Sequence, residues 1–427
     1  MKLDYRLTFL VGLGFMTINV FWQVYEFIIP LIMLKVFEIS DTVAGFVMSF
    51  DNVLALFMIP VFGMLSDKTI TPIGRRMPYI IAGTGISVVA MLLIPFSVNR
   101  HNLGLFVGAL AFVLLAMSSY RSPAVALMPD VTPKPLRSKG NAVINLMGAL
   151  GGIIALSLIS LMAPEQGSSN YWPVFLVVAL IMIAGVMILK MMVNEPAAVA
   201  KMEAESQEIE QEDENTVEDL KKLPVAYKRS LIFILLSVSL WYMGYNAVTS
   251  AFSKYALVAL HIGESRSALI LVVASLAAVV SFLPVAMIST KIGRKKTILV
   301  GVTALAIIFG SMFFYREYSP LMFVSFSLAG IAWAAINVNS LPMVLEMAKG
   351  SNVGRYTGYY YTFSMAAQVV TPIFSGFLLQ HVGYFILLPY ASGFVWLSFL
   401  TMLLVKHGDS KPLVTKSGLE AFDEMDS

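Results

Sequence analysis

The chain has 427 residues, of which 58% are hydrophobic and only 13% are charged, and its formal net charge is +3. So few charges cannot cover a water-soluble globule of this size, so the composition excludes a soluble protein and indicates one that lies in lipid. The absence of cysteine excludes disulfides and thiolate metal sites. We expect no nucleic-acid partner and no cofactor.

Twelve apolar segments follow one another, each near the length of about 20 residues that a helix needs to cross the hydrocarbon core. Those of the first half cover residues 7–35, 42–65, 79–98, 103–128, 140–162 and 171–193. Those of the second half cover residues 229–257, 265–290, 297–315, 319–346, 355–380 and 383–405. Closed helices satisfy their own backbone groups in lipid, so we predict an all-α integral membrane protein with two six-helix bundles.

Polar segments divide the chain into four parts. We expect an N-terminal six-helix bundle over 1–193, an acidic linker over 194–228, a C-terminal six-helix bundle over 229–405 and a polar tail over 406–427. The linker contains EAESQEIEQEDENTVEDLKK, whose charge density is typical of a solvated linker or a surface helix. Most of the Lys and Arg residues fall in cytoplasmic loops if both termini are cytoplasmic, and this bias predicts that topology in the cell membrane.

Two stretches of the chain repeat one plan. GMLSDKTITPIGRRMP (Gly63–Pro78) and AMISTKIGRKKT (Ala286–Thr297) each follow one apolar segment and precede another. A short basic cytoplasmic turn therefore occurs at the same place in both halves. This repetition is typical of a duplicated membrane protein and favours a transporter.

The ends of the fourth and tenth apolar segments also match. An acid, an arginine and a glycine recur in the same order: Asp130, Arg137 and Gly140, then Glu346, Arg355 and Gly358. Nine residues before the two acids stand Arg121 and Asn337, so the halves place different polar groups at matching depths. A symmetric scaffold with an asymmetric centre is the expected result.

The first loop carries a family resemblance. Its SD-x-T-x-T-x-x-GRR-x-P form resembles the loop of the plant sucrose transporters, their animal relatives and bacterial homologues, near the glycoside-pentoside-hexuronide cation symporters. The segment Tyr120–Asp130 is similar to the arginine-to-aspartate segment of their fourth span, and Phe50–Leu56 and Gly244–Val248 look like the bacterial branch.

This resemblance covers both halves of the chain. It implies the major facilitator fold, with two parallel bundles and a substrate bound between them near the midplane. It also implies proton-coupled uptake of a sugar or glycoside by a monomer. Plant members carry an acid before the fourth-span arginine, whereas residues 110–119 here contain no carboxylate, so another acid must accept the proton.

Two other carboxylates lie well within predicted spans. Ionised groups at the depth of Asp51 and Glu26 are unfavourable unless they are paired or hydrated. An acid that meets Arg121 in one conformation and leaves it in another binds and releases a proton as the carrier rocks. We favour Asp51 as the coupling acid, with Glu26 second. The alternatives are that Asp51 is a fixed partner of Arg121 and that Glu26 faces a hydrated outer vestibule.

Arg121 is the basic residue that falls inside a span. Its guanidinium offers five donors in a planar fork, which suits either a carboxylate or several sugar hydroxyls. We expect it to act on the substrate or in coupling. The alternative is a static ion pair that orders the bundle.

Aromatic and amide side chains provide the expected lining of a sugar site, because aromatic faces and amide groups match the two kinds of surface that sugars present. The candidates besides Arg121 are Trp22, Gln23, Tyr245, Asn246 and Asn337. Trp22, Gln23 and Glu26 share one face of the first span with Asn19. The alternative for each is a hydrogen bond between helices.

Charged residues at the cytoplasmic ends of the spans predict a gate. We expect pairs that form when the inside is closed and release when it opens: Asp67 with Arg75 and Arg76, Asp130 with Arg137, and Glu346 with Arg355. Exposed pairs contribute only about 0–1 kcal/mol each, which suits a carrier that must cycle. The basic residues also suit a topological anchor. The second loop has Thr290 where the first has Asp67.

A secondary transporter accounts for these features best. An enzyme is not expected, because the sequence offers no metal cluster, nucleophile–base set or phosphate loop. We expect proton:sugar symport, with sodium less favoured as the coupling ion because no second carboxylate stands beside Asp51. Proton-coupled drug efflux and a non-transporting membrane protein are the alternatives.

Overall fold

The computed structural model describes residues 3–133, 136–164, 169–210, 225–347 and 353–409, and long helices dominate it. The first half contains α1 (Tyr5–Lys35), α2 (Asp41–Asp67), α3 (Met77–Asn99), α4 (Leu103–Asp130), α5 (Arg137–Met162) and α6 (Trp172–Met192). After α7 (Glu195–Glu210), the second half contains α8 (Val225–Val258), α9 (Glu264–Ile292), α10 (Arg294–Met312), α11 (Leu321–Leu345), α12 (Val353–His381), η3 (Tyr384–Ile386) and α13 (Leu387–Leu403). Within the described residues, twelve helices are long and apolar enough to cross a membrane, so the predicted all-α membrane fold is confirmed.

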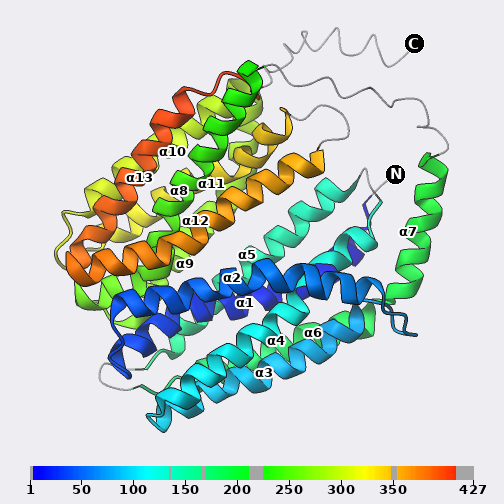
Figure 1. Ribbon diagram of the computed structural model, residues 1–427, viewed down its shortest axis with the longest axis horizontal. Helices are drawn as coiled ribbons and strands as arrows, with labels where there is room; N and C mark the ends of the chain where they lie inside the picture. The colour runs from blue at the N-terminus through cyan, green and yellow to red at the C-terminus, as the bar shows by residue number, and fades with distance from the viewer. Residues whose placement is uncertain (1–2, 134–135, 165–168, 211–224, 348–352, 410–427) are drawn as a thin grey trace.

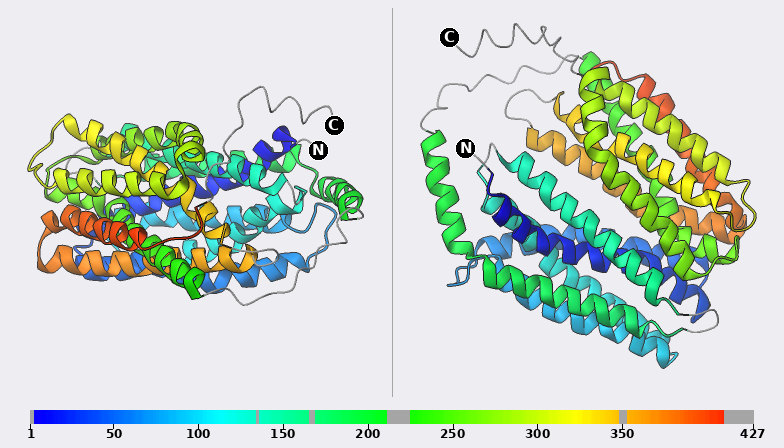
Figure 2. Two further views of the ribbon diagram at one scale, coloured as in Figure 1. Left: turned by 90° about the horizontal axis from the view of Figure 1, so that it is seen from above. Right: turned by 180° about the vertical axis from the view of Figure 1, so that it is seen from behind.

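Each half has its own apolar core. In the N-terminal half, α1 packs against α5 and α3 against α4, around buried side chains such as Phe21 and Phe106. In the C-terminal half, α9 packs against α11 and α8 against α13, around Trp241 and Phe309. The two bundles lie side by side in Figure 1 and in the right view of Figure 2. Most of the stabilising burial therefore lies within a half rather than between halves.

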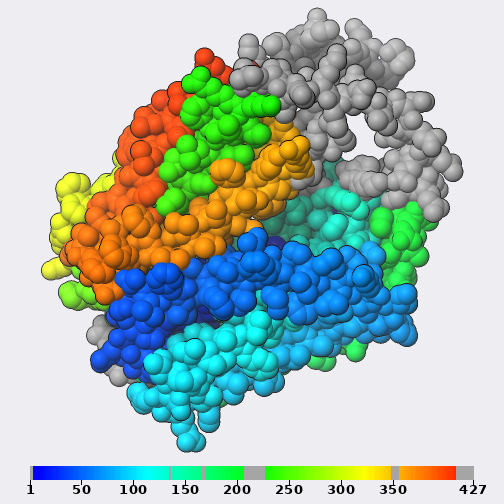
Figure 3. All heavy atoms as spheres, viewed as in Figure 1, coloured from blue at the N-terminus to red at the C-terminus, as the bar shows by residue number. Residues whose placement is uncertain are grey.

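The bundles touch at one end and separate at the other. We call the end that carries loop 68–76 and Gly293 the inner end, and the end that carries residues 36–40 and 259–263 the outer end. The two sets of helices converge at the outer end and spread apart toward the inner end, where α7 lies (Figure 1). The surface is hollowed between α5 and α12 on that side (Figure 3). The structure is therefore open at the inner end and closed at the outer end.

Close helix packing closes the outer end. α2 of the first half crosses α12 of the second, and a Cβ atom on Gly45 would lie 2.2 Å from the carbonyl oxygen of Pro372. Ser49 Oγ donates to the carbonyl of Val369 at 2.7 Å across the same contact. Small residues allow two helices to approach closely in a membrane. This crossing joins the two halves without a side chain between the backbones.

The acidic segment 194–228 begins with a helix. α7 covers its first part, and α8 begins at Val225, before the predicted start of the seventh span at residue 229. The remaining residues of the segment, 211–224, lie outside the described part of the chain, as does most of the predicted tail beyond residue 409.

Candidate substrate and coupling site

Arg121 lies on α4, near residues of α1 and α2, and has no direct polar partner among the described residues. Its half-buried guanidinium carbon lies 5.6 Å from the centroid of the Trp22 ring. The charges of Asp51 and Glu26 both act on it, yet no described residue forms a hydrogen bond or an ion pair with it. In this conformation, Arg121 is thus near two acids but is not locked in a static ion pair with either.

α1 carries an aromatic and acidic face toward this arginine. Trp22 and Tyr25 meet edge to face with ring centroids 5.4 Å apart, and Glu26 follows one turn after Trp22. The buried Trp22 Nε1 and Tyr25 hydroxyl have no hydrogen-bond partner among the described residues. Unpartnered buried donors are unfavourable, so they indicate a place that water or a ligand satisfies.

Gln23 faces α5 rather than the aromatic cluster. A Cβ atom on Gly152 would lie 3.4 Å from Gln23 Oε1, and α1 packs closely on α5 here. Within the described chain, the Gln23 amide forms no hydrogen bond. The helix-to-helix hydrogen bond, which was the alternative to substrate binding for Gln23, is therefore absent in this conformation.

Asp51 reaches the site from α2. Its half-buried carboxylate accepts a hydrogen bond from Asn52 Nδ2 at 2.9 Å. The fixed Asp51–Arg121 pair that the sequence left open as an alternative is not formed. A carboxylate held by one amide can still gain or lose a proton at its second oxygen.

The second half supplies a stacked aromatic pair. Tyr245 on α8 and Trp333 on α11 stack with ring centroids 3.7 Å apart and an angle of 4° between their planes, and Tyr242 meets Trp333 edge-on. The charge of Glu26 acts on Tyr245, so α1 and α8 face each other here. The sequence analysis did not select Trp333, although it stands one turn before Asn337, which could have drawn attention to this face.

Asn246 and Asn337 add amide groups to the same half. Asn246 Nδ2 is buried without a described partner, while the Asn246 carbonyl accepts from Ser250 Oγ at 2.7 Å. Asn337 is exposed and lies one helical turn from Trp333, away from the apolar exposed face of α11 at Leu328. Its amide therefore lies on another face of α11 than Leu328 and is accessible.

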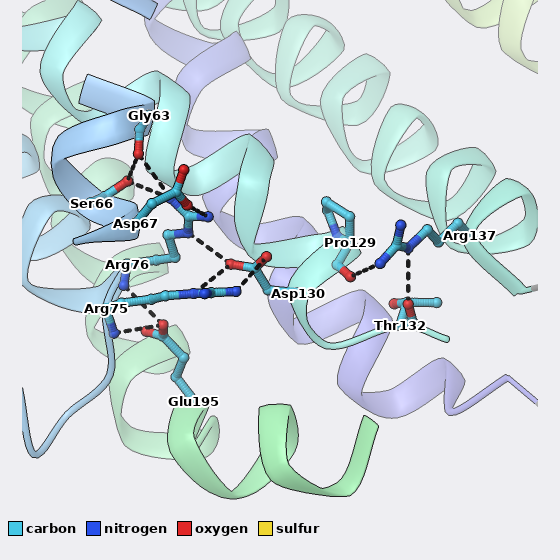
Figure 4. A network of polar contacts seen from close by, with 10 residues as sticks. All are labelled: Gly63, Ser66, Asp67, Arg75, Arg76, Pro129, Asp130, Thr132, Arg137 and Glu195. Carbon is cyan, nitrogen blue, oxygen red and sulfur yellow. Dashed lines mark hydrogen bonds and ion pairs between the residues drawn. The ribbon is translucent and has the colours of Figure 1, made fainter. Parts of the chain in front are cut away.

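The first loop motif forms a compact network at the inner end (Figure 4). The buried Arg76 donates from Nε to Asp130 Oδ2 at 2.7 Å, from Nη1 to Ser66 Oγ at 2.5 Å, and also pairs with Asp67. Arg75 Nη2 lies 2.9 Å from Asp130 Oδ1. Burial alone lowers the pKa of Arg76, but Asp130 and Asp67 outweigh this effect and raise it, so the guanidinium stays charged.

Glu195 completes this network, and the sequence analysis missed it. Its carboxylate accepts hydrogen bonds from the backbone N–H groups of Arg75, Arg76 and Met77, each at 2.8 Å (Figure 4). Gly74 precedes them with φ +108°, a conformation that favours glycine. The first residue of α7 thus caps the N-terminus of α3, where an anion is stabilising.

The same arrangement recurs in the second half with another acid. Asp409 accepts the N–H of Arg294 at 2.8 Å and that of Lys295 at 3.3 Å, just after Gly293 with φ +97°. Asp409 follows the last span of its half, as Glu195 follows the last span of the first half. An acid that follows the last span therefore accepts the N–H groups of the basic loop in both halves, although Thr290 stands in the second loop where the first has Asp67.

Two of the predicted gate pairs are not formed in this conformation. Arg137 donates to the carbonyls of Pro129 and Thr132 instead of Asp130, which binds Arg75 and Arg76 (Figure 4). Arg355 donates to the Tyr359 hydroxyl at 2.7 Å, whereas Glu346 pairs with Arg294. Arg137 thus binds backbone carbonyls at and after the end of α4, and the two acids pair with arginines next to α3 and at the start of α10.

The predicted pairing of Asp67 with the loop arginines is, in contrast, not released. The inner end is open, yet the pairs of Asp67 and Asp130 with the two arginines are intact. All of these residues belong to one half. The network therefore holds the first half together and does not depend on contact with the second.

Comparison with known proteins identifies the family. The Major Facilitator Superfamily model matches residues 7–315 and 234–422 of the chain. Sucrose transport protein SUC3 of Arabidopsis thaliana is 28% identical over 153 residues, which cover 31% of this chain and 24% of that protein. Sucrose transport protein SUT3 of Oryza sativa subsp. indica is 28% identical over 142 residues, 28% of this chain and 26% of that protein. The chain thus matches about a quarter of the length of these relatives.

Solved structures share the fold over nearly the whole chain. The inward open xylose transporter XylE from E. coli has a TM-score of 0.68 and 14% identity, covering 99% of both chains. The nucleoside transporter NupG has a TM-score of 0.68 and 15% identity, over 94% of this chain and 100% of its own. The chain is a multi-pass membrane transporter, not an enzyme, and belongs to the Major Facilitator Superfamily.

Proposed function

We propose that the protein is a proton-coupled symporter of a sugar or glycoside that works by alternating access. The observation that carries this proposal is Arg121, a charged donor on α4 that has two acids nearby and no direct partner among the described residues. A guanidinium left free in this way can bind hydroxyl groups of a substrate or accept a carboxylate. The partial likeness to sucrose transport proteins supports a sugar as the substrate.

The lining fits a sugar better than an apolar drug. Unpartnered donors at Trp22 Nε1 and Asn246 Nδ2 can bind hydroxyls, and the Tyr245–Trp333 stack offers an aromatic surface for the C–H face of a sugar ring. Gln23 and Asn337 are further candidates because their amides form no hydrogen bonds with described residues. A polar site that rejects molecules without hydroxyl groups does so because its own donors would be left unpaired.

Proton coupling follows from the acids around Arg121. A carboxyl group in a dry environment holds its proton, and a guanidinium within reach favours release. We propose Asp51 as the group that alternates between these states, with Glu26 as the second candidate. Substrate binding at Arg121 would separate it from the acid, so that proton and sugar are carried together.

We propose that the inner end faces the cytoplasm and that the protein acts as a monomer in the cell membrane. The inner end carries the basic loop residues Arg75, Arg76 and Lys295, as the positive-inside rule requires. In this orientation, the open conformation described above exposes the site to the cytoplasm.

The test is uptake of a panel of radiolabelled sugars and glycosides into proteoliposomes with an imposed inward proton gradient. We expect gradient-driven accumulation by the native chain, which Asp51→Asn loses while it still exchanges sugar. Glu38→Gln, an exposed acid in the outer loop, is the matched control and should accumulate sugar normally.

Other outcomes would assign the protein differently. Accumulation that follows a sodium gradient would show that sodium, not the proton, is the coupling ion. Accumulation retained by Asp51→Asn but lost by Glu26→Gln would move the coupling acid to α1. No uptake of any sugar, together with pH-dependent movement of lipophilic cations, would replace symport by drug efflux.

A further inference from the structure

Two buried ion pairs join the halves at the outer end, and neither takes part in the site described above. In the first, Asp41 Oδ1 accepts from Lys254 Nζ at 2.5 Å, and Asp41 Oδ2 accepts from the Tyr384 hydroxyl at 2.7 Å. Asp41 belongs to the N-terminal half, whereas Lys254 and Tyr384 belong to the C-terminal half. We call these three residues the Asp41 latch.

The second ion pair has the same composition with the halves exchanged. Glu264 Oε1 accepts from Lys35 Nζ at 2.7 Å and from the Tyr171 hydroxyl at 3.0 Å. Glu264 belongs to the C-terminal half, whereas Lys35 and Tyr171 belong to the N-terminal half. We call these three residues the Glu264 latch.

The duplicated fold relates the two latches. Each acid is the first residue of the second long helix in its half, α2 or α9. Each lysine lies in the last turn or two of the helix before, and each tyrosine stands at the start of the last span of its half. One acid–lysine–tyrosine plan therefore occurs twice, and each acid binds the lysine and tyrosine of the opposite half.

Burial makes these contacts depend on the closed outer end. The side chains of Lys254 and Asp41 are 5% and 10% exposed, and those of Lys35 and Glu264 are 21% and 4% exposed. A buried charge is strongly unfavourable once its partner is removed, so the pairs can part only where water replaces them. Beside the Asp41 latch, the interface leaves a cavity of about 10 Å³, lined by Ala44, Met48 and Ser250 among others.

The two latches differ in how completely they are satisfied. Both carboxylate oxygens of Asp41 have partners, whereas Glu264 Oε2 is buried without a described partner. A buried acceptor without a hydrogen bond loses stability relative to a satisfied one. The Asp41 latch therefore holds the outer end more firmly than the Glu264 latch.

We propose that the Asp41 and Glu264 latches are the reciprocal outer gate of this transporter, which holds the inward-open state and separates when the outer end opens. The latches would have this role whichever substrate and coupling ion the protein carries. Loss of either latch moves the population toward the outward-open state, and loss of the Asp41 latch moves it further.

The chain has no cysteine, so one introduced thiol can report on the outer end. Ser250→Cys, in the cavity beside the Asp41 latch, is labelled in right-side-out membranes with a membrane-impermeant maleimide. We expect slow labelling in the native background and several-fold faster labelling with Asp41→Asn, Lys254→Met or the milder Tyr384→Phe. Glu264→Gln should give a smaller increase, and Glu317→Gln, an exposed acid in the outer α10–α11 loop, none.

Charge exchange separates a latch from a general loss of structure. Asp41→Lys combined with Lys254→Asp should return labelling toward the native rate, whereas each single reversal should accelerate it. Equal labelling of Tyr384→Phe, Asp41→Asn and Glu317→Gln would overturn the proposal, as would a double exchange that labels as fast as the single reversals. Elution of each variant as one monodisperse peak in detergent identifies any that is misfolded, and Tyr384→Phe, which removes only one hydroxyl, then decides the outcome.

Discussion

The outer and inner ends of this transporter use charge in opposite ways. At the outer end, the ion pairs Lys254–Asp41 and Lys35–Glu264 cross between the halves. At the inner end, each ion pair stays within its own half. Arg76 joins α2, α3 and α4 of the first half, and Arg294 joins α10 and α11 of the second. The difference teaches that a charged motif near a predicted gate can stiffen one half, while less conspicuous charges at span ends hold two halves together.

The largest effect should come from adding one methyl group between the halves. Gly45→Ala places a Cβ atom 2.2 Å from the Pro372 carbonyl oxygen, which the backbone of α12 cannot avoid while the outer end stays closed. Alanine favours a helix over glycine by about 1 kcal/mol, so α2 itself should not weaken. We expect a folded protein fixed away from the inward-open state, with transport lost and Ser250→Cys labelling fast.

Gly330→Ala is the matched control for this substitution. Its Cβ atom would lie 2.1 Å from the Ala274 carbonyl oxygen, but both helices, α11 and α9, belong to one half. We expect a lower thermal unfolding temperature instead of a change in labelling. Similar labelling and similar melting of the two variants would contradict the distinction between contacts within and between halves.

Removal of Arg76 should give the next largest effect. Arg76→Met leaves the mostly buried Asp130 with only Arg75 and removes one of the two hydrogen bonds of Ser66, so we expect a loss of about 2–4 kcal/mol in stability. Arg75→Gln, whose side chain is 37% exposed, should lose only about 0–1 kcal/mol. Thermal melts of the purified variants measure both, and Ser250→Cys labelling should be unchanged. Faster labelling of Arg76→Met would show that the motif acts on the outer gate after all.

Removal of the two capping acids at the inner end, Glu195 and Asp409, should lower stability less than Arg76→Met. Glu195→Ala leaves three backbone N–H groups of α3 without their acceptor, and we expect a loss of about 1–2 kcal/mol. Asp409→Ala frees only two, one of them in a long bond of 3.3 Å, so its loss should be about half as large. Melting temperatures compare the two, with Glu205→Ala, which forms only an exposed pair with Lys201, as the control. An equal loss in all three would mean that the caps contribute nothing specific.

The smallest effect concerns a pair that does not form. A double-mutant cycle of Asp130→Asn with Arg137→Gln should give a coupling energy near zero, because Arg137 binds the carbonyls of Pro129 and Thr132 instead. The same cycle of Asp130→Asn with Arg76→Met should give a coupling of about 1–3 kcal/mol. Thermal stability provides all the terms. Comparable coupling in both cycles would restore the pairing that the sequence predicted.

The helices could be predicted well because each membrane span requires a long run of apolar residues. The first predicted span, 7–35, ends at the same residue as α1, and α8 begins four residues before the predicted seventh span. Depth along a helix is also readable from the positions of charged residues within an apolar segment, so Asp51, Glu26 and Arg121 stand out in the sequence alone. These features depend on one helix at a time.

The sequence did not predict which residue on another helix each charged residue binds. Asp130 and Arg137 are close in the chain, yet Asp130 binds arginines from the loop before α3. Lys254 and Asp41 are far apart in sequence and each resembles an ordinary charge at a span end. Trp333 lies in an apolar segment and does not differ there from a core aromatic residue. Glu195 is one of many acids in the segment 194–228, so nothing in the sequence distinguishes it. Partner choice depends on the packing of the halves, which a single sequence does not record.

The reciprocal latches also bear on the history of the fold. Each acid binds a lysine and a tyrosine from the other half, so two identical six-helix chains with one such set of three residues would form both latches at once. That is the geometry of a symmetric homodimer, in which each residue meets its partner across a two-fold axis. On such a route, gene fusion would have joined an interface that already existed, and the differences at Arg121 and Asn337 would have arisen on a scaffold that already contained both latches.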